Sequence, residues 1–185
     1  MIEHGPVQKS AAAFAEKRVR EGEVMRIVST VLNGGEIPAK YGKHGDTKND
    51  FGVPSISVPF EIQDAPEGTV CYALVLDDVD AVPVCGFTWI HWVAANIKKS
   101  VVPENDSVNA DYPQGVNSWL QTYGKQGAVG YGGMTPPDAP HTYTLKVYAL
   151  DAELPLENGF YLNELMHAMK GHILAQAEAE GVYNN

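Results

Sequence analysis

Two apolar runs lie between residues 72 and 97, and polar residues interrupt them at the short segment that separates the runs. In the first run, residues 72–76 are almost entirely apolar, which is typical of a strand buried on both faces. Three carboxylates follow it, at Asp77, Asp78 and Asp80. A carboxylate at the end of a buried strand costs free energy unless a donor or a cation stabilises it. The pattern therefore predicts a buried strand whose acidic end has a polar or cationic partner.

The second run predicts a strand over residues 88–97 that carries one imidazole. Under the two-residue period of a strand, His91 shares a face with three apolar side chains, those of Trp89, Val93 and Ile97. The two polar interruptions, the carboxylates of the first strand and the imidazole of the second, are therefore expected to face one another.

The remaining strands are separated by turns rather than by helices. Residues 24–32 predict a strand that the turn at 33–35 closes, and residues 36–53 predict a polar loop. Residues 55–62 predict a strand that Pro59 confines to a sheet edge or a bulge. Because strand and turn repeat without intervening helices, the sequence predicts antiparallel sheets.

Helices are predicted at the two ends of the chain. Residues 8–23 have a composition that favours helix, and either a packed N-terminal helix or a solvated lead-in segment fits it. Apolar residues between 162 and 173 recur at near-helical spacing, which predicts one amphipathic helix, bent at Gly171 and with Asn163 as its N-cap. The 185 residues are expected to form one domain, residues 24–185, after an N-terminal helical extension, residues 1–23.

A long polar stretch, residues 98–130, leads into a segment rich in glycine and proline, residues 131–141. Unstructured connections of this length are uncommon in compact domains and are usually functional when they occur. The glycines allow close backbone approach and the prolines stiffen the path. The second segment is either a rigid surface loop or the wall of a pocket, and the strand that follows it favours the pocket wall.

That strand, predicted over residues 141–150, carries two polar groups on one otherwise apolar face. His141 and Tyr143 are two positions apart, which corresponds to roughly 7 Å along a strand. Both side chains are therefore expected to reach one small ligand.

Composition narrows the classes of function. A formal net charge of −10 without clustered Lys or Arg argues against nucleic acid and anionic membranes as partners. No run approaches the roughly 20 apolar residues that span a bilayer, and the N-terminus lacks the basic and apolar regions of a signal peptide, so a cytoplasmic protein is expected. Cys71 and Cys85 lack metal-ligand spacing and are predicted to be small buried thiols.

Two motifs occur in a fixed order along the chain. An acidic loop followed by a Trp-His strand comprises Asp78, Asp80, Pro83, Trp89, His91 and Asn96. A Gly/Pro-rich loop that leads into a His-Tyr strand comprises Gly132, Gly133, Pro136, Pro137, His141 and Tyr143. Together they resemble the signatures of the phosphatidylethanolamine-binding protein family, also called the Raf kinase inhibitor protein family, and within it the small bacterial and archaeal branch. The resemblance extends over residues 24–183 and includes the Gly-His-Ile-Leu segment at 171–174.

Three positions depart from the motifs of that family. Val79 stands where the family has a proline and is expected to loosen the acidic loop, and Thr142 replaces the arginine of the second motif. Met134 stands where the pocket wall of the family continues with proline, and it is expected to make the pocket mouth more apolar and adaptable.

The resemblance implies a mainly β, α+β fold, with a Greek-key-like antiparallel β-sandwich of two sheets and C-terminal helices. It also implies a pocket at the sheet end that binds phosphate, a phospholipid headgroup or a nucleotide, with no catalysis, cofactor or metal. Carried over residue by residue, the expected ligand-binding set is Asp78, Asp80, Pro83, Trp89, His91, Gly133, Pro137, His141 and Tyr143. Some family members regulate kinases or inhibit serine proteases, and related bacterial proteins are often dimers, so a kinase or protease partner and a homodimer are open alternatives.

The residue types in this set fit an anion site. His91, His141 and Tyr143 offer N–H and O–H donors, and hydrogen bonds to a charged group are about twice as strong as neutral ones. Asp78 or Asp80 is expected to hold an imidazole in one orientation and to favour its cationic form. Binding is therefore expected to weaken as the pH rises above neutrality.

Two other functions stay open at this point. Two histidines and two aspartates also fit a divalent-metal site, and hence a metal-assisted hydrolase. A protein-interaction inhibitor without a physiological small ligand would instead use the pocket mouth and the 98–130 loop. The chain contains no G-x-S-x-G motif, which argues against a serine hydrolase.

Overall fold

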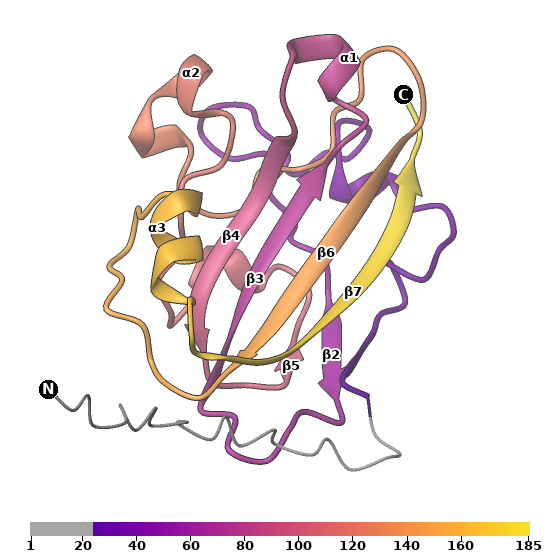
Figure 1. Cartoon of the computed structure of the whole chain (residues 1–185). Helices are drawn as coiled ribbons and strands as arrows, with labels where there is room; N and C mark the ends of the chain where they lie inside the picture. The colour runs from indigo at the N-terminus through magenta and orange to yellow at the C-terminus, as the bar shows by residue number, and fades with distance from the viewer. Residues whose placement is uncertain (1–23) are drawn as a thin grey trace, which may run out of the picture.

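The computed structural model describes residues 24–185, and the helix predicted within residues 8–23 lies outside the described residues. The strands form two antiparallel sheets (Figure 1). One has the order β1 (Arg26–Val28), β2 (Phe60–Gln63), β5 (Val101–Val102). The other has the order β4 (Trp89–Ile97), β3 (Cys71–Asp78), β6 (His141–Leu150), β7 (Ile173–Tyr183). The prediction of a mainly β chain with antiparallel sheets and few helices is confirmed, while the Greek-key order and the domain boundary at residue 24 stay predictions.

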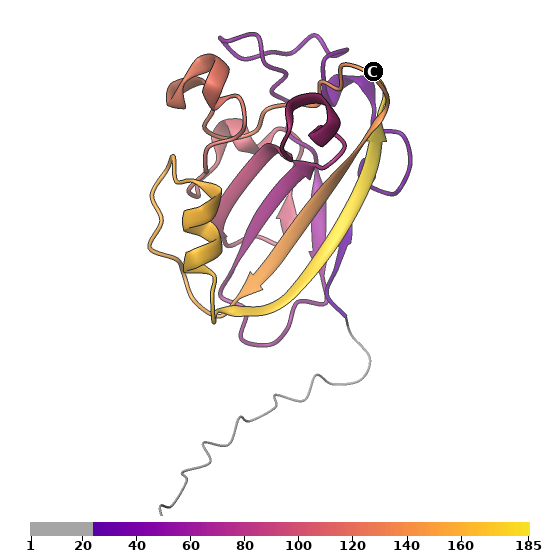
Figure 2. The same ribbon diagram turned by 45° about the horizontal axis from the view of Figure 1, so that its top comes forward.

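The main core draws on both sheets. Phe60 of the smaller sheet meets Trp92 of the larger sheet edge to face, with ring centroids 6.5 Å apart. A second buried cluster lies on the opposite face of the four-stranded sheet, where Leu165 and Met169 cover Val75. Leu165 lies in helix α3 (Leu162–Ala168), and Met169 directly follows it. This helix lies beside β4 in Figure 2. The larger sheet is therefore covered by apolar side chains on both faces.

The central strands follow their sequence patterns. Every residue of β3 is buried, as its apolar run predicts for a strand covered on both faces. In β6 the odd-numbered residues from His141 to Ala149 are buried and the even-numbered ones to Tyr148 are half-buried, so His141 and Tyr143 share the inner face. The β3–β6 register pairs Asp78 with Tyr143. This pairing brings the acidic end of one strand to the polar start of the other.

Two predicted strands are shorter than the sequence suggested. In place of a strand over 24–32, β1 ends at Val28, because the Ser29 hydroxyl accepts hydrogen bonds from the backbone N–H groups of Val31 and Leu32 and turns the chain. In place of a strand over 55–62, β2 begins at Phe60, after Pro59, whose backbone has no N–H to donate to a ladder.

The prediction of one C-terminal helix reaching residue 173 is wrong. Helix α3 ends at Ala168, and the chain turns through Gly171, whose φ of +88° suits glycine, into the strand β7. From there the side chains alternate: alanines pack toward the main core, while Gln176, Glu178 and Glu180 are exposed. The N-cap of α3 is Tyr161 rather than Asn163, and the Glu164 carboxylate accepts a hydrogen bond from the Tyr161 N–H at 2.7 Å.

Short helical turns occupy much of the loop regions. Helix α1 (Val82–Cys85) joins β3 to β4 and lies above the ends of these strands in Figure 2. The polar stretch after β4 is not structureless, since it contains β5, α2 (Leu120–Tyr123) and two 3₁₀ turns, Asp106–Asn109 and Lys125–Gly127; a third, Ala39–Tyr41, precedes β2. None of the helices in residues 24–185 is both long enough and apolar enough to cross a membrane.

Candidate functional site

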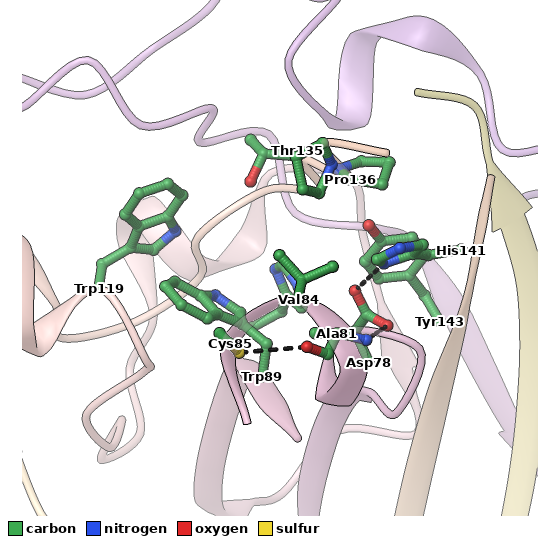
Figure 3. A pocket seen from close by; sticks show the side chains of 12 residues that line it. Asp78, Ala81, Val84, Cys85, Trp89, Trp119, Thr135, Pro136, His141 and Tyr143 are labelled. Atoms are coloured by element: carbon green, nitrogen blue, oxygen red, sulfur yellow. Dashed lines mark hydrogen bonds and ion pairs between the residues drawn. The ribbon is translucent and has the colours of Figure 1, made fainter. Parts of the chain in front are cut away.

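A cavity of about 190 Å³ lies at the edge of the larger sheet where β3 ends and β4 and β6 begin, next to α1 (Figure 3). Side chains from four separate segments line it: the end of β3 with α1, the start of β4, the loop residue Trp119, and the Pro-rich segment with the start of β6. The lining residues are Asp78, Ala81, Val84, Cys85, Trp89, His91, Trp119, Thr135, Pro136, Pro137, His141 and Tyr143. The structure thus brings Asp78, His91 and His141 to one shared cavity.

Six of the nine residues expected to form the ligand-binding set line this cavity, and three do not. Asp80 is exposed, and its carboxylate accepts a hydrogen bond from the Thr142 backbone N–H at 2.9 Å, which ties the acidic loop to β6. Pro83 is exposed on α1. Gly133 packs against other backbone, since a Cβ there would lie 2.6 Å from the carbonyl oxygen of Tyr41.

His91 faces the cavity because of a β-bulge in β4. The register pairs Leu76 with Trp92 and the next residue, Asp77, with Ile90, so His91 is an extra residue on its strand. The expectation that His91 shares a face with Val93 is therefore wrong. The His91 ring packs against Tyr143, with centroids 5.1 Å apart, while Val93 lies in the buried cluster on the other face of the sheet.

Asp78 holds His141 in one orientation. The Oδ2 atom of Asp78 lies 2.8 Å from Nδ1 of His141, both side chains are buried, and Oδ1 of Asp78 accepts a hydrogen bond from the Ala81 N–H. Burial alone lowers the pKa of the His141 imidazole, but the hydrogen bond and charge of Asp78, with Asp138 adding to them, raise the pKa above its usual value. The carboxylate therefore favours the cationic form of this imidazole, as the sequence predicted.

Neither imidazole presents a free N–H to the cavity, contrary to expectation. The Nε2 atom of His141 lies 3.0 Å from Oδ1 of Asp138, so carboxylates occupy both ring nitrogens. Nδ1 of His91 donates to the carbonyl oxygen of Gly132 at 2.6 Å. Burial lowers the pKa of His91, so the ring is neutral near pH 7 and its Nε2 atom is an acceptor rather than a donor.

Four polar atoms in the cavity wall are buried and unpaired. The Nε2 atom of His91, the Tyr143 hydroxyl and the indole nitrogens of Trp89 and Trp119 have no hydrogen-bond partner within the described part of the chain. Figure 3 shows both indole nitrogens turned toward the middle of the pocket. Burial, followed by the nearby charge of Asp78, raises the pKa of the Tyr143 phenol, which therefore stays protonated. The wall thus holds three N–H or O–H donors and one imidazole acceptor.

Sequence reasoning missed several residues that line or adjoin the cavity. Trp119 comes from the polar stretch, where Asn117 accepts a hydrogen bond from its backbone N–H and the absence of a side chain at Gly132 leaves room for its indole ring. Asp138, at the rim, contacts His141. A tryptophan in a polar stretch was the available signal for Trp119. The other missed lining residues are Ala81, Val84, Cys85, Thr135 and Pro136.

The departures from the family motifs have local consequences. Met134 is buried in the main core, where its sulfur lies 3.9 Å from the Tyr131 hydroxyl, so the expectation that it lies at the pocket mouth is wrong. Val79 is exposed beside the acidic loop, and Thr142 is half-buried on the other face of β6 from His141.

The two cysteines are free thiols. Cys71 is buried as predicted, whereas Cys85 is only half-buried.

The metal-site hypothesis joined both histidines with Asp78 and Asp80. Within residues 24–185, no group of three or more His, Cys, Asp or Glu side chains is arranged to hold a metal ion. Asp80 instead bonds to the backbone of β6, and Asp78 and Asp138 bond to the His141 ring.

Comparison with known proteins identifies the family. The family model described as "Phosphatidylethanolamine-binding protein" matches residues 28–184, which is most of the chain. The chain belongs to the phosphatidylethanolamine-binding protein family. Relatives in bacteria and archaea, among them proteins of Chlamydia muridarum (35% identical) and Methanothermobacter thermautotrophicus (32% identical), assign it to the bacterial and archaeal branch of that family.

Individual relatives agree with this assignment. The uncharacterised protein YxkA of Bacillus subtilis is 47% identical over 150 residues, which cover 76% of this chain and 89% of YxkA. The crystal structure of CT736 from Chlamydia trachomatis, described as a putative phosphatidylethanolamine-binding protein homologue, matches with a TM-score of 0.74 and 32% identity, covering 89% of this chain and 99% of CT736. Escherichia coli YbcL shares the fold, with a TM-score of 0.70 and 24% identity over 87% of this chain and 98% of YbcL.

Proposed function

We propose that the cavity binds a small anionic or phosphorylated group and that the protein acts by binding rather than by catalysis. The proposal is carried by the four unpaired polar atoms of His91, Tyr143, Trp89 and Trp119 around one cavity. A buried polar group without a partner costs about 1–3 kcal/mol, so four such groups around one cavity call for an explanation. A bound oxyanion supplies acceptors for the three donors at once.

The charge and size of the cavity support the same class of ligand. The imidazole of His141, whose cationic form Asp78 and Asp138 favour, lies in the same wall and offers its Nε2–H to an anion when Asp138 does not occupy it. A volume of about 190 Å³ is smaller than the roughly 300–1,000 Å³ of pockets that enclose drug-sized ligands. This accommodates a phosphate or carboxylate group with a few attached atoms, so the acyl chains of a lipid or the base of a nucleotide would stay outside.

Isothermal titration calorimetry of the full chain tests the proposal with inorganic phosphate, O-phosphoethanolamine and, as the ligand without an anion, ethanolamine. The two phosphate compounds are expected to bind and ethanolamine is not. Tyr143→Phe removes one donor and is expected to weaken phosphate binding by about tenfold. Tyr148→Phe, on the same strand but packed against the other buried cluster, is the matched control and is expected to bind as the wild type does. Absence of binding, or equal affinity in both variants, rejects the proposal.

A protein partner is a second candidate, favoured by apolar side chains at the pocket mouth. Val82 and Val84 of α1 are 41% and 45% exposed, and Phe87, directly after α1, is 47% exposed. Clustered exposed apolar side chains are typical of interaction surfaces. Crosslinking in cells followed by purification of the tagged full chain tests this candidate. Recovery of a kinase or protease by the wild type, but not by a Val82→Ser/Phe87→Ser variant that still binds phosphate, supports it. Equal recovery by both rejects it.

A further inference from the structure

The His141 imidazole lies between two carboxylates that differ in burial. Asp78 contacts Nδ1 at 2.8 Å and its side chain is 4% exposed, whereas Asp138 contacts Nε2 at 3.0 Å and its side chain is 56% exposed. Asp78 is also fixed by the backbone N–H of Ala81. The carboxylate of Asp138, by contrast, contacts His141 and the backbone N–H groups of its own exposed loop, those of Asp138 and Ala139. Breaking the contact with Asp78 would leave a buried carboxylate without its partner. Breaking the contact with Asp138 leaves that carboxylate in water.

The backbone around Asp138 is stiff, while its side chain is more than half exposed to water. Pro137 precedes it and Pro140 follows two residues later, and proline fixes its own φ angle near −65°. The carbonyl oxygen of Asp138 also accepts a hydrogen bond from the Asn185 side chain at 3.1 Å. Rotation about the side-chain bonds is thus sufficient to move the carboxylate from His141 into water, while the loop stays in place.

Asp138 occupies the hydrogen-bond donor that an anionic ligand in the cavity would use. His141 lines the cavity, but both of its N–H groups are already used, and the three side chains Asp78, His141 and Asp138 together carry one net negative charge. An entering oxyanion meets this excess charge unless the Asp138 carboxylate leaves. Its departure exposes one donor, the Nε2–H of His141, and removes one repulsive charge.

We propose that Asp138 is an internal competitor of the ligand: its carboxylate occupies the His141 Nε2–H that a bound phosphate or sulfate oxygen takes over. This inference rests on the proposed anion-binding function and adds a residue that limits its affinity and selects its ligands. A ligand with a full negative charge replaces the carboxylate at Nε2, whereas a neutral alcohol or amide does not compensate for the lost ion pair.

Calorimetric titration with inorganic phosphate tests this role in the wild type, Asp138→Asn and Asp138→Ala. Asn keeps the shape of the side chain without its charge, and Ala removes the contact. Because an exposed ion pair contributes little, both variants are expected to bind phosphate about two- to fivefold more tightly than the wild type. Glu180→Gln removes one exposed carboxylate from the neighbouring strand β7 and is the control for the change in net charge. Its affinity is expected to stay within error of the wild type at 150 mM salt, where the charge is screened over about 8 Å.

The results separate this inference from the proposed function. Tighter binding in both Asp138 variants but not in Glu180→Gln supports competition, and so does binding that appears only in the Asp138 variants. Wild-type binding with equal or weaker affinity in both Asp138 variants overturns the role of Asp138 while the anion site stands. No binding in any variant overturns both. A crystal structure of the wild-type complex gives a second readout, because an Asp138 carboxylate that remains within 3.5 Å of Nε2 beside the bound phosphate contradicts displacement.

Discussion

The Nδ1 atom of His141 lies 2.8 Å from the Oδ2 atom of Asp78, although 63 positions separate the two residues in the sequence. The antiparallel pairing of β3 with β6 causes this approach, since it places Asp78 opposite Tyr143, two residues after His141. Both side chains are buried, so the pair is shielded from water and from salt. Asp78 therefore fixes the orientation of the imidazole at the cavity and, together with the exposed Asp138, favours its cationic form.

Replacing Asp78 with Asn is expected to destabilise the fold. Asn has a single acceptor oxygen where Asp78 serves two donors, the Nδ1–H of His141 and the backbone N–H of Ala81. One buried donor therefore loses its partner, and the free energy of unfolding falls by about 3 kcal/mol. Urea denaturation measures this loss. Asp151→Asn is the matched control, because Asp151 makes the same contact with His172 at 2.9 Å with both side chains about half exposed. Its cost is expected to stay below about 1 kcal/mol, and equal costs for the two variants would contradict the importance of burial.

The same ion pair predicts how stability depends on pH. The pKa of His141 is raised in the folded protein, so its contribution is fully present below the unfolded pKa of about 6.5 and is lost as the pH rises through the folded pKa. The free energy of unfolding of the wild type is therefore expected to decline above about pH 6.5 by a component that Asp78→Asn lacks. Urea titrations of both proteins from pH 5.5 to 9 measure this difference. Parallel curves would show that His141 gains no proton affinity from Asp78.

Ligand binding is expected to show its own pH dependence, which originates at His91. Burial lowers the pKa of His91, so its unpaired Nε2 atom accepts hydrogen bonds near neutral pH. Sulfate carries no proton near neutral pH, so it cannot donate a hydrogen bond to Nε2 of His91. Its binding must therefore be accompanied by uptake of a proton at Nε2. Its affinity should therefore fall as the pH rises above the lowered pKa of His91, by at most about tenfold per pH unit.

Calorimetry in two buffers of different ionisation enthalpy counts the protons taken up with sulfate. A phosphomonoester, whose second pKa is about 6, brings its own proton at lower pH and is expected to show a weaker dependence there. Sulfate affinity that does not change between pH 5.5 and 8 would exclude His91 as the acceptor that must be protonated.

The parts of the fold that follow simple periodicity could be predicted from the sequence. The apolar run in β3 reflects burial on both faces, and the alternation in β6 reflects burial on one face. These two patterns were enough to predict that Asp78, His141 and Tyr143 lie at one end of the sheet. The β7 strand was missed because Ile173 continues the helical spacing of α3, and only the turn at Gly171 separates the two periods.

The remaining features of the site depend on contacts that no local period encodes. The bulge at His91 changes which face of β4 its neighbours occupy, and it becomes visible only in the register with β3. Trp119 and Asp138 lie on loops whose positions depend on contacts with distant segments: Trp119 packs on Gly132, and the Asp138 carbonyl oxygen accepts a hydrogen bond from Asn185. The loop that carries Asp138 brings its carboxylate to Nε2 of His141. Because the sequence does not show this contact, it suggested that His141 has a free donor.

Tyr143→Phe separates the structural from the binding role of the hydroxyl. Tyr143 is fully buried, and its hydroxyl has no hydrogen-bond partner of good geometry within residues 24–185, only a weak interaction with the nearby Asp78 carboxylate, so its removal costs the fold little. The free energy of unfolding is expected to stay unchanged or to rise by up to about 1 kcal/mol, as measured by urea denaturation. A loss of about 1 kcal/mol or more would instead reveal a structural hydrogen bond, and weaker phosphate binding in this variant would then have a structural cause.

Gly132 is expected to be essential for the position of Trp119. A Cβ at Gly132 would lie 2.6 Å from Cδ1 and 2.9 Å from Nε1 of the Trp119 indole, and 3.1 Å from the Asn117 side-chain nitrogen. Gly132→Ala therefore forces the indole out of the cavity wall and costs about 1–3 kcal/mol of stability, with weaker phosphate binding and a red shift of tryptophan emission as the ring meets water.

Gly35→Ala is the matched control for this steric effect. Gly35 also lacks a positive φ, but a Cβ there would approach only the Oδ1 atom of the exposed Asn33, at 3.0 Å, and shifting that side chain disturbs only one exposed hydrogen bond, from the Gly35 N–H. Its stability is expected to change by less than about 1 kcal/mol, with emission and phosphate affinity as in the wild type. If Gly132→Ala left the emission and the affinity unchanged, the Trp119 indole would have no part in the anion site, and the donors of the cavity would reduce to Trp89 and Tyr143.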